Sequence, residues 1–181
     1  MNTADLRSIK TEKALKNSLL GLMKTKVFSE ISTKEIYSSV LIGKSTFYNH
    51  YVDKYDLLSQ IISDEVNVFE DLLQKRVDQI TNTDLLIELY ESLYEKKEAF
   101  LTLCSNQNDG IDFKQILTVK LSQFASLKIN EKAFPVPNDF VTDLYASSAL
   151  QAIIWSLKAN QPETIATFMN KVMLAVYKIH S

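Results

Sequence analysis

The chain has 181 residues, enough for one large or two small domains with a buried core, and only three Gly and three Pro. So few turn residues argue against a β-sandwich or barrel and predict an all-α protein, while a single cysteine excludes a disulfide framework and a cysteine-rich zinc site. The net charge of -2 is uneven: residues 1–62 hold nine Lys or Arg against six Asp or Glu, which favours docking of the N-terminal end on a polyanion.

Three helices are predicted before residue 52. Apolar residues recur at helical spacing over about residues 5–25, and Ser32 to Glu35 forms a capping box that starts a second helix ending at about Val40. The segment Leu41-Ile42-Gly43 is predicted to turn the chain into a third helix at about residues 44–51. This pattern predicts a helix-turn-helix.

Longer helices are predicted for the rest of the chain. Asp53 caps a fourth helix that runs unbroken to about Ile80, and further helices are expected at about 84–104, 111–127, 138–158 and 162–179. Asn138 is the expected cap of the helix at 138–158, and Pro162 suits the first turn of the last helix. Apolar residues from Ile165 to Tyr177 cover too wide an arc for one buried edge, which indicates a subunit interface.

The predicted third helix carries the candidate binding residues. Phe47 and Tyr51, four residues apart, are expected to pack inward, so the opposite side presents Lys44, Ser45, Thr46, Tyr48 and Asn49. These residue types suit base edges and phosphates in a DNA major groove, with His50 at the margin. The expected phosphate contacts around this helix are Thr33 and Lys34 on the second helix and Lys54 on the fourth.

These residues also carry a family resemblance. Residues 45–58 closely resemble the helix-turn-helix signature of TetR-type (TetR/AcrR) regulators, and the matching positions are Thr33, Ile36, Thr46, Phe47, Tyr48, Tyr51, Lys54 and Leu57. The resemblance implies a three-helix DNA-binding head at residues 1–54 and a helical regulatory and dimerisation body at 55–181, about nine helices in all. It further implies a homodimer, paired through the last two helices, on a palindromic operator in double-stranded DNA.

The turn departs from that signature. Leu41 stands where the backbone often needs a positive φ, and Gly43 replaces a capping hydroxyl. In the C-terminal half, Trp155 followed by Asn160-Gln161-Pro162 is weakly similar to the subgroup of dihydroxyacetone-kinase regulators.

The leading hypothesis is a cytoplasmic transcription regulator, a repressor released by a small-molecule inducer or a partner, with an activator or a protein-interaction module on the same fold as alternatives. Neither a catalytic constellation, a cofactor motif, a metal-ligand set nor a membrane span is recognised in the sequence. Aromatic residues of the body are candidates for a ligand pocket, although core packing explains them too: Tyr90, Tyr94, Phe113, Phe124, Tyr145 and Trp155.

Overall fold

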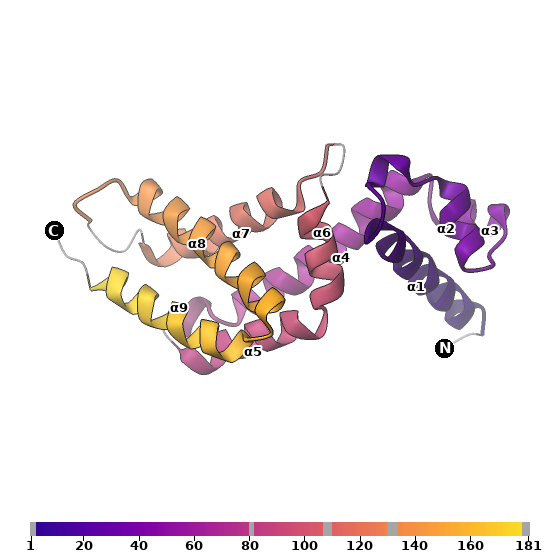
Figure 1. Cartoon of the computed structure of the whole chain (residues 1–181). Coiled ribbons are helices and arrows are strands. Elements are labelled where there is room, and N and C mark those ends of the chain that lie inside the picture. The colour runs from indigo at the N-terminus through magenta and orange to yellow at the C-terminus, as the bar shows by residue number, and fades with distance from the viewer. Residues whose placement is uncertain (1–2, 80–81, 107–109, 130–133, 179–181) are drawn as a thin grey trace. The chain divides into compact units, whose positions relative to one another are not determined.

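A computed structural model describes residues 3–79, 82–106, 110–129 and 134–178 of the chain. Within these ranges it has nine α-helices and two short 3-10 helices and no strand, which confirms the all-α prediction (Figure 1). The chain divides into two compact units. The head unit comprises the residues up to Glu65 together with Thr102–Asp112, and the body unit comprises Val66–Leu101 and the residues from Phe113 onward. The predicted domain boundary after residue 54 falls at the start of α4 and stays a prediction.

The head unit is built from α1 (Thr3–Met23), α2 (Thr33–Ser39), α3 (Lys44–His50) and the first part of α4 (Lys54–Gln74). These helices enclose a core of side chains that are fully removed from solvent: Leu15, Leu19, Phe28, Ile36, Phe47, Leu57 and Leu58. The predicted capping box at α2 is confirmed, because Ser32 Oγ accepts from the Glu35 N–H at 3.2 Å and Glu35 Oε2 accepts from the Ser32 N–H at 2.9 Å. Asp53 caps α4 as predicted, through its Oδ1.

The turn between α2 and α3 has the geometry that the sequence indicated. Leu41 has φ 57°, in the left-handed region. Its N–H donates to the Ser38 carbonyl at 3.2 Å, and the Ile42 N–H donates to the Tyr37 carbonyl at 2.9 Å. This pair of bonds is a Schellman motif, in which the left-handed position is usually glycine. A leucine that is 96% exposed therefore occupies a strained position without burying its side chain.

Two helices end earlier than the sequence predicted. α4 stops at Gln74 instead of continuing to Ile80, since the Arg76 N–H bonds to the Leu73 carbonyl three residues back, and a 3-10 helix follows at Val77–Gln79. The predicted helix at 84–104 is two helices, α5 (Thr83–Glu95) and α6 (Lys97–Ser105), separated at Lys96. Leu93 and Phe100 are both buried and lie two helical turns apart in the sequence, so the apolar period continues across the break and hides it.

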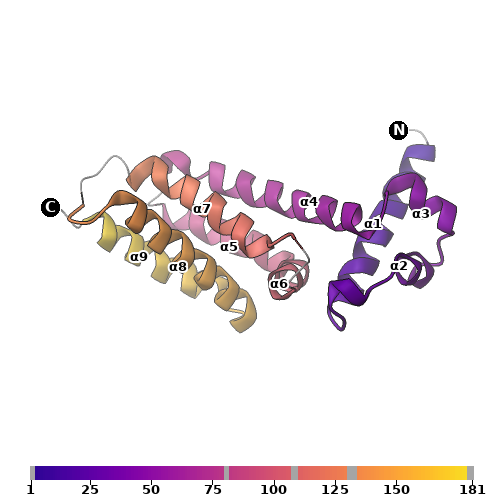
Figure 2. The ribbon, with the colours of Figure 1, turned by 90° about the horizontal axis from the view of Figure 1, so that it is seen from above.

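The body unit is completed by α7 (Phe113–Ile129), α8 (Asn138–Ala159) and α9 (Pro162–Tyr177). α8 packs on α7 and on α9, and α9 packs on α5 (Figure 2). Pro162 occupies the first turn of α9, as predicted. Asn138 does not cap α8: Pro137 is the N-cap and accepts from the Val141 N–H through its carbonyl, so Asn138 is already the first helical residue.

Large apolar side chains stand in solvent on the last two helices. Phe140, Leu144 and Trp155 on α8 are 58%, 56% and 49% exposed, and Phe168 on α9 is 59% exposed. In the ranges that the structure describes, no helix combines the length and the hydropathy that crossing a bilayer requires.

Candidate nucleic-acid interface

The two sides of α3 differ as its sequence predicts. Phe47 is fully buried and Tyr51 is 2% exposed, whereas Lys44, Ser45 and Asn49 are exposed. Thr46 is partly buried at the edge between the two sides. One helix of seven residues thus anchors itself in the core and presents a cation, a hydroxyl and an amide to solvent.

Tyr48 is held on the outer side of α3 by its neighbours. Its ring, in a residue that is 48% exposed, meets the Phe47 ring edge-on with 5.3 Å between centroids. Lys44 Nζ lies 5.9 Å from the centroid of the Tyr48 ring, from one helical turn before. Contact with a buried ring restricts the side-chain rotamers of the tyrosine on the outer side of α3.

The predicted flanking residues lie on α2. Thr33 is the first residue of α2 and is partly buried, and Lys34 follows it in an exposed position. A second basic edge lies on α1, where Arg7 and Lys10 border a shallow hollow of about 370 Å³ that also includes Ile42 of the turn. The sequence patterns do not single out Arg7, because a lone cation near the N-terminus has no local signal.

Lys54 has a different role from the predicted phosphate contact. Its ammonium donates to the carbonyl oxygens of Phe28 at 3.0 Å, Ser29 at 2.9 Å and Ile31 at 2.8 Å. An ammonium has three donors, so these bonds use all of them. The amides at the start of α4 are also engaged, because Asp53 Oδ1 accepts from Tyr55 and Asp56. Lys54 closes the segment before α2 onto α4 and is a structural residue of the head.

His50 points to α1 rather than to the outer side of α3. Its Nδ1 lies 3.3 Å from Glu12 Oε1, and its side chain is 15% exposed. Two further lysines of the head are held by carboxylates, Lys16 by Asp64 and Lys26 by Glu35. The exposed cations near α3 therefore include Lys44 on the helix itself and Lys34 on α2, with Arg7 and Lys10 on the edge formed by α1.

Comparison of sequences with protein families and with curated proteins finds no match. Solved structures do match over nearly the whole chain. A TetR transcriptional regulator from Streptococcus agalactiae 2603V has a TM-score of 0.67 and 22% identity, covering 93% of this chain and 96% of its own. The dihydroxyacetone kinase operon activator DhaS has a TM-score of 0.62 and 20% identity over 96% and 99% of the two chains.

This chain has the TetR-type fold. A third structure of that fold, a TetR-family transcriptional regulator from Syntrophomonas wolfei str. Goettingen, has a TM-score of 0.61 and 19% identity over 91% of this chain and 95% of its own. The fold agrees with the resemblance of residues 45–58, and DhaS represents the subgroup that Trp155 and residues 160–162 resemble. At these identities the likeness establishes the fold alone.

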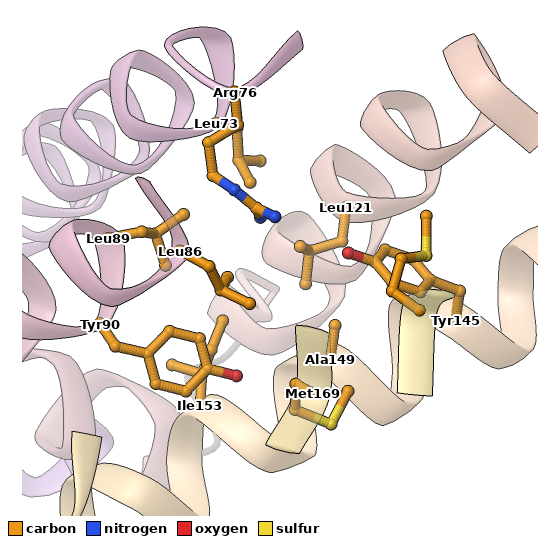
Figure 3. Close-up of a pocket in the computed structure, with 11 residues that line it drawn as sticks. Leu73, Arg76, Leu86, Leu89, Tyr90, Leu121, Tyr145, Ala149, Ile153 and Met169 are labelled. Carbon is orange, nitrogen blue, oxygen red and sulfur yellow. The ribbon is translucent and has the colours of Figure 1, made fainter. Parts of the chain in front are cut away.

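In the TetR-type body, two of the six predicted pocket residues meet. Tyr90 and Tyr145 line one internal cavity (Figure 3). Phe124 borders a separate hollow with α4, and Phe113 is in the core with its ring edge-on to Phe100 at 5.5 Å. Tyr94 donates from its hydroxyl to Asn160 Oδ1 at 3.2 Å, in the turn between α8 and α9. Trp155 is 49% exposed on α8.

The same cavity contains a residue that the sequence patterns do not single out. Arg76 is 2% exposed and lines the cavity with the two tyrosines. A signal for it exists, because Arg76 follows Leu72 and Leu73 at a spacing of four and three residues. That spacing places it on the apolar side of the fourth helix as the sequence predicts it, where a charged residue is unusual.

Proposed function

We propose that this protein is a homodimeric transcription regulator, a repressor, that binds a specific operator by inserting α3 into the DNA major groove. The observation that carries the proposal is the division of α3 into a buried side at Phe47 and Tyr51 and an outer side at Lys44, Ser45, Tyr48 and Asn49. A helix that serves only for packing needs the buried side alone. The outer side combines the hydrogen-bond donors and acceptors that recognise base edges.

Each outer residue has a distinct expected contact. Asn49 pairs with the N6 and N7 positions of an adenine, and Lys44 reaches a guanine edge or a phosphate. Tyr48, Ser45 and the methyl group of Thr46 contact a thymine methyl or the sugar-phosphate chain. Thr33 and Lys34 at the start of α2 hold the phosphates on the opposite side of the groove. Lys54 supports these contacts indirectly by fixing the segment before α2.

The exposed apolar residues of α8 and α9 support the dimer. Four large side chains in solvent on two adjacent helices form a surface that a monomer has no reason to keep apolar. A symmetric pair of heads then places two α3 helices in successive major grooves, about 34–36 Å apart or at a multiple of that spacing. A ligand or partner that favours another arrangement of the heads weakens operator binding by shifting the population.

Genome-wide capture of bound DNA, followed by binding titrations on the recovered operator, tests the proposal. Asn49→Ala should weaken operator binding by about 1–3 kcal/mol and relax the preference at one base pair, because it removes a bidentate contact. Lys44→Ala should also weaken it, whereas Lys114→Ala, which removes an exposed cation from α7, is the matched control. Binding that is unselective, or unchanged by Asn49→Ala and Lys44→Ala together, would favour a protein-interaction module instead.

An activator is the second candidate. It is favoured by the likeness to DhaS, whose description is that of an operon activator. Deletion of the gene, with transcription measured from the captured promoters, separates the two. Transcription that rises on deletion supports a repressor, and transcription that falls supports an activator.

A further inference from the structure

An internal cavity of the body unit has an unusual lining. It lies among the end of α4, α5, α7, α8 and α9, and its volume is about 20 Å³, room for about one water molecule. Most of its wall is aliphatic, including Leu86, Leu121 and Ile153. The side chains of Arg76, Tyr90 and Tyr145 interrupt this apolar wall (Figure 3).

Arg76 places a positive charge in the cavity wall. In Figure 3 its guanidinium reaches from the chain after α4 toward Leu121 and the Tyr145 hydroxyl. The guanidinium carbon also lies 5.8 Å from the centroid of the Phe124 ring. Burial lowers the pKa of Arg76, but a guanidinium in a protein remains protonated at neutral pH. A buried charge needs hydrogen bonds or an opposite charge around it, so the arginine makes this part of the cavity wall polar.

The polar groups of the cavity are all able to donate hydrogen bonds. A guanidinium has donors and no acceptor, and a tyrosine hydroxyl can donate one hydrogen bond. Burial raises the pKa of Tyr90 and of Tyr145, which keeps both hydroxyls protonated. A group that only accepts is the complement of this set. The small polar region favours a planar carboxylate, which a guanidinium binds through two parallel bonds, over a bulkier phosphate.

We propose that this cavity is the site of a small carboxylic acid with a compact aliphatic body. Its carboxylate lies on Arg76 and Tyr145, and its hydrocarbon part lies among the aliphatic side chains. The role of this ligand as a signal that changes operator binding rests on the proposed function. The binding site itself does not depend on that function.

The present volume requires the cavity to open for such a ligand. Met169 and Met173 of α9 form part of its wall, and an unbranched thioether side chain adjusts readily to a new shape. Phe168, beside Met169 in the sequence, is exposed on the helix that we propose for the dimer interface. Movement of the α9 side chains by a ligand therefore has a direct route to the subunit contact.

Calorimetric titration of the full-length protein without DNA tests the site, with acetate, butyrate and hexanoate as probes at constant ionic strength. Affinity should rise by about fourfold per added methylene, as expected for buried hydrocarbon, until the cavity is full. Hexanol has the same body without the charge and should bind at least tenfold more weakly than hexanoate. Equal binding of hexanoate and hexanol, or no binding of any probe, would overturn the proposal.

Variants locate the binding within the cavity. Arg76→Met should abolish the preference for hexanoate over hexanol. If that variant does not fold, Tyr145→Phe decides, because it removes one hydroxyl and keeps the ring that packs against Ala125, Ile129 and Val141. It should weaken hexanoate binding about tenfold, the loss of one hydrogen bond to a charged group. Tyr94→Phe, whose hydroxyl lies outside the cavity, is the matched control, and a loss as large as that of Tyr145→Phe would contradict the site.

The DNA titration separates this proposal from the proposed function. Hexanoate should shift operator affinity in the native protein and not in Tyr145→Phe. If the protein binds carboxylates but not DNA, the proposed binding site stands and the proposed regulatory function is wrong. If the protein binds an operator selectively but binds no carboxylate, the proposed regulatory function stands and the proposed binding site is wrong.

Discussion

Lys54 Nζ lies 4.7 Å from the centroid of the Phe28 ring and donates a 3.0 Å hydrogen bond to the carbonyl oxygen of the same residue. Two further carbonyls, of Ser29 and Ile31, complete its set of acceptors. The three carbonyls belong to a short 3-10 helix and its C-cap. That of Phe28 also accepts from the Ile31 N–H, and the ammonium at the start of α4 donates to all three. This lysine links the approach to α2 with α4 inside the head.

Lys54→Met should lower the free energy of unfolding by about 2 kcal/mol, because it removes hydrogen bonds to a charged donor. Lys54→Arg should not restore stability, since a planar guanidinium does not match three converging carbonyls. Urea denaturation measures both. The salt dependence of operator binding should stay unchanged in either variant, whereas Lys34→Ala should reduce its slope by about 0.9, the value for one phosphate contact. A reduced slope in Lys54→Met would show that this lysine does reach DNA.

Leu41→Gly should stabilise the head unit. A left-handed backbone costs an L-residue about 1–2 kcal/mol, and glycine regains about 1 kcal/mol of this after its larger entropy in the unfolded chain. Little burial is lost, because Leu41 is 96% exposed. Thermal and urea denaturation give the change. Leu41→Ala removes the side chain and keeps the strain, so a gain in that variant would show that exposure rather than φ is responsible.

Glu35 should make the stability of the head depend on acid pH. Hydrogen bonds from Lys26 and then from the backbone and side chain of Ser32 lower the pKa of this carboxyl to about 2. A lowered folded pKa means that the stabilisation is complete above the ordinary pKa of 4.5 and is lost as pH falls toward 2. Urea denaturation of Glu35→Gln should show a deficit at pH 7 that disappears between these values. Glu95→Gln, at the end of α5, is the matched control variant.

Tyr51→Phe should leave the protein equally or more stable. Among the buried side-chain atoms that the structure describes, the Tyr51 hydroxyl has no hydrogen-bond partner, and burial raises its pKa to about 12. Removing it avoids a desolvation cost, for a gain of up to about 1 kcal/mol. Because the unfolded tyrosine loses its proton near pH 10 and the folded one does not, native stability falls between pH 10 and 12. The fall should be smaller in Tyr51→Phe than in the exposed control Tyr55→Phe, and a destabilised Tyr51→Phe would indicate a hydrogen bond to this hydroxyl.

Local patterns account for what could be predicted from the sequence. The capping box at Ser32, the cap at Asp53 and the positive φ at Leu41 each depend on residues within one turn of the chain. The buried side of α3 follows from the four-residue spacing of Phe47 and Tyr51. A helix break at Lys96 was missed because the apolar period is the same on both sides of it.

The sequence by itself therefore determined the all-α architecture, the helix-turn-helix and its outer residues, because periodicity and capping act over short distances. Tertiary structure decided the partners of the charged residues. Lys54 meets carbonyls that lie 23 to 26 residues earlier, and Arg76 meets Tyr145 from another helix. Periodicity indicates that a side chain faces inward, but only packing decides which distant groups share its surroundings. The same lysine could be a DNA contact or a structural residue until the carbonyls around it were known.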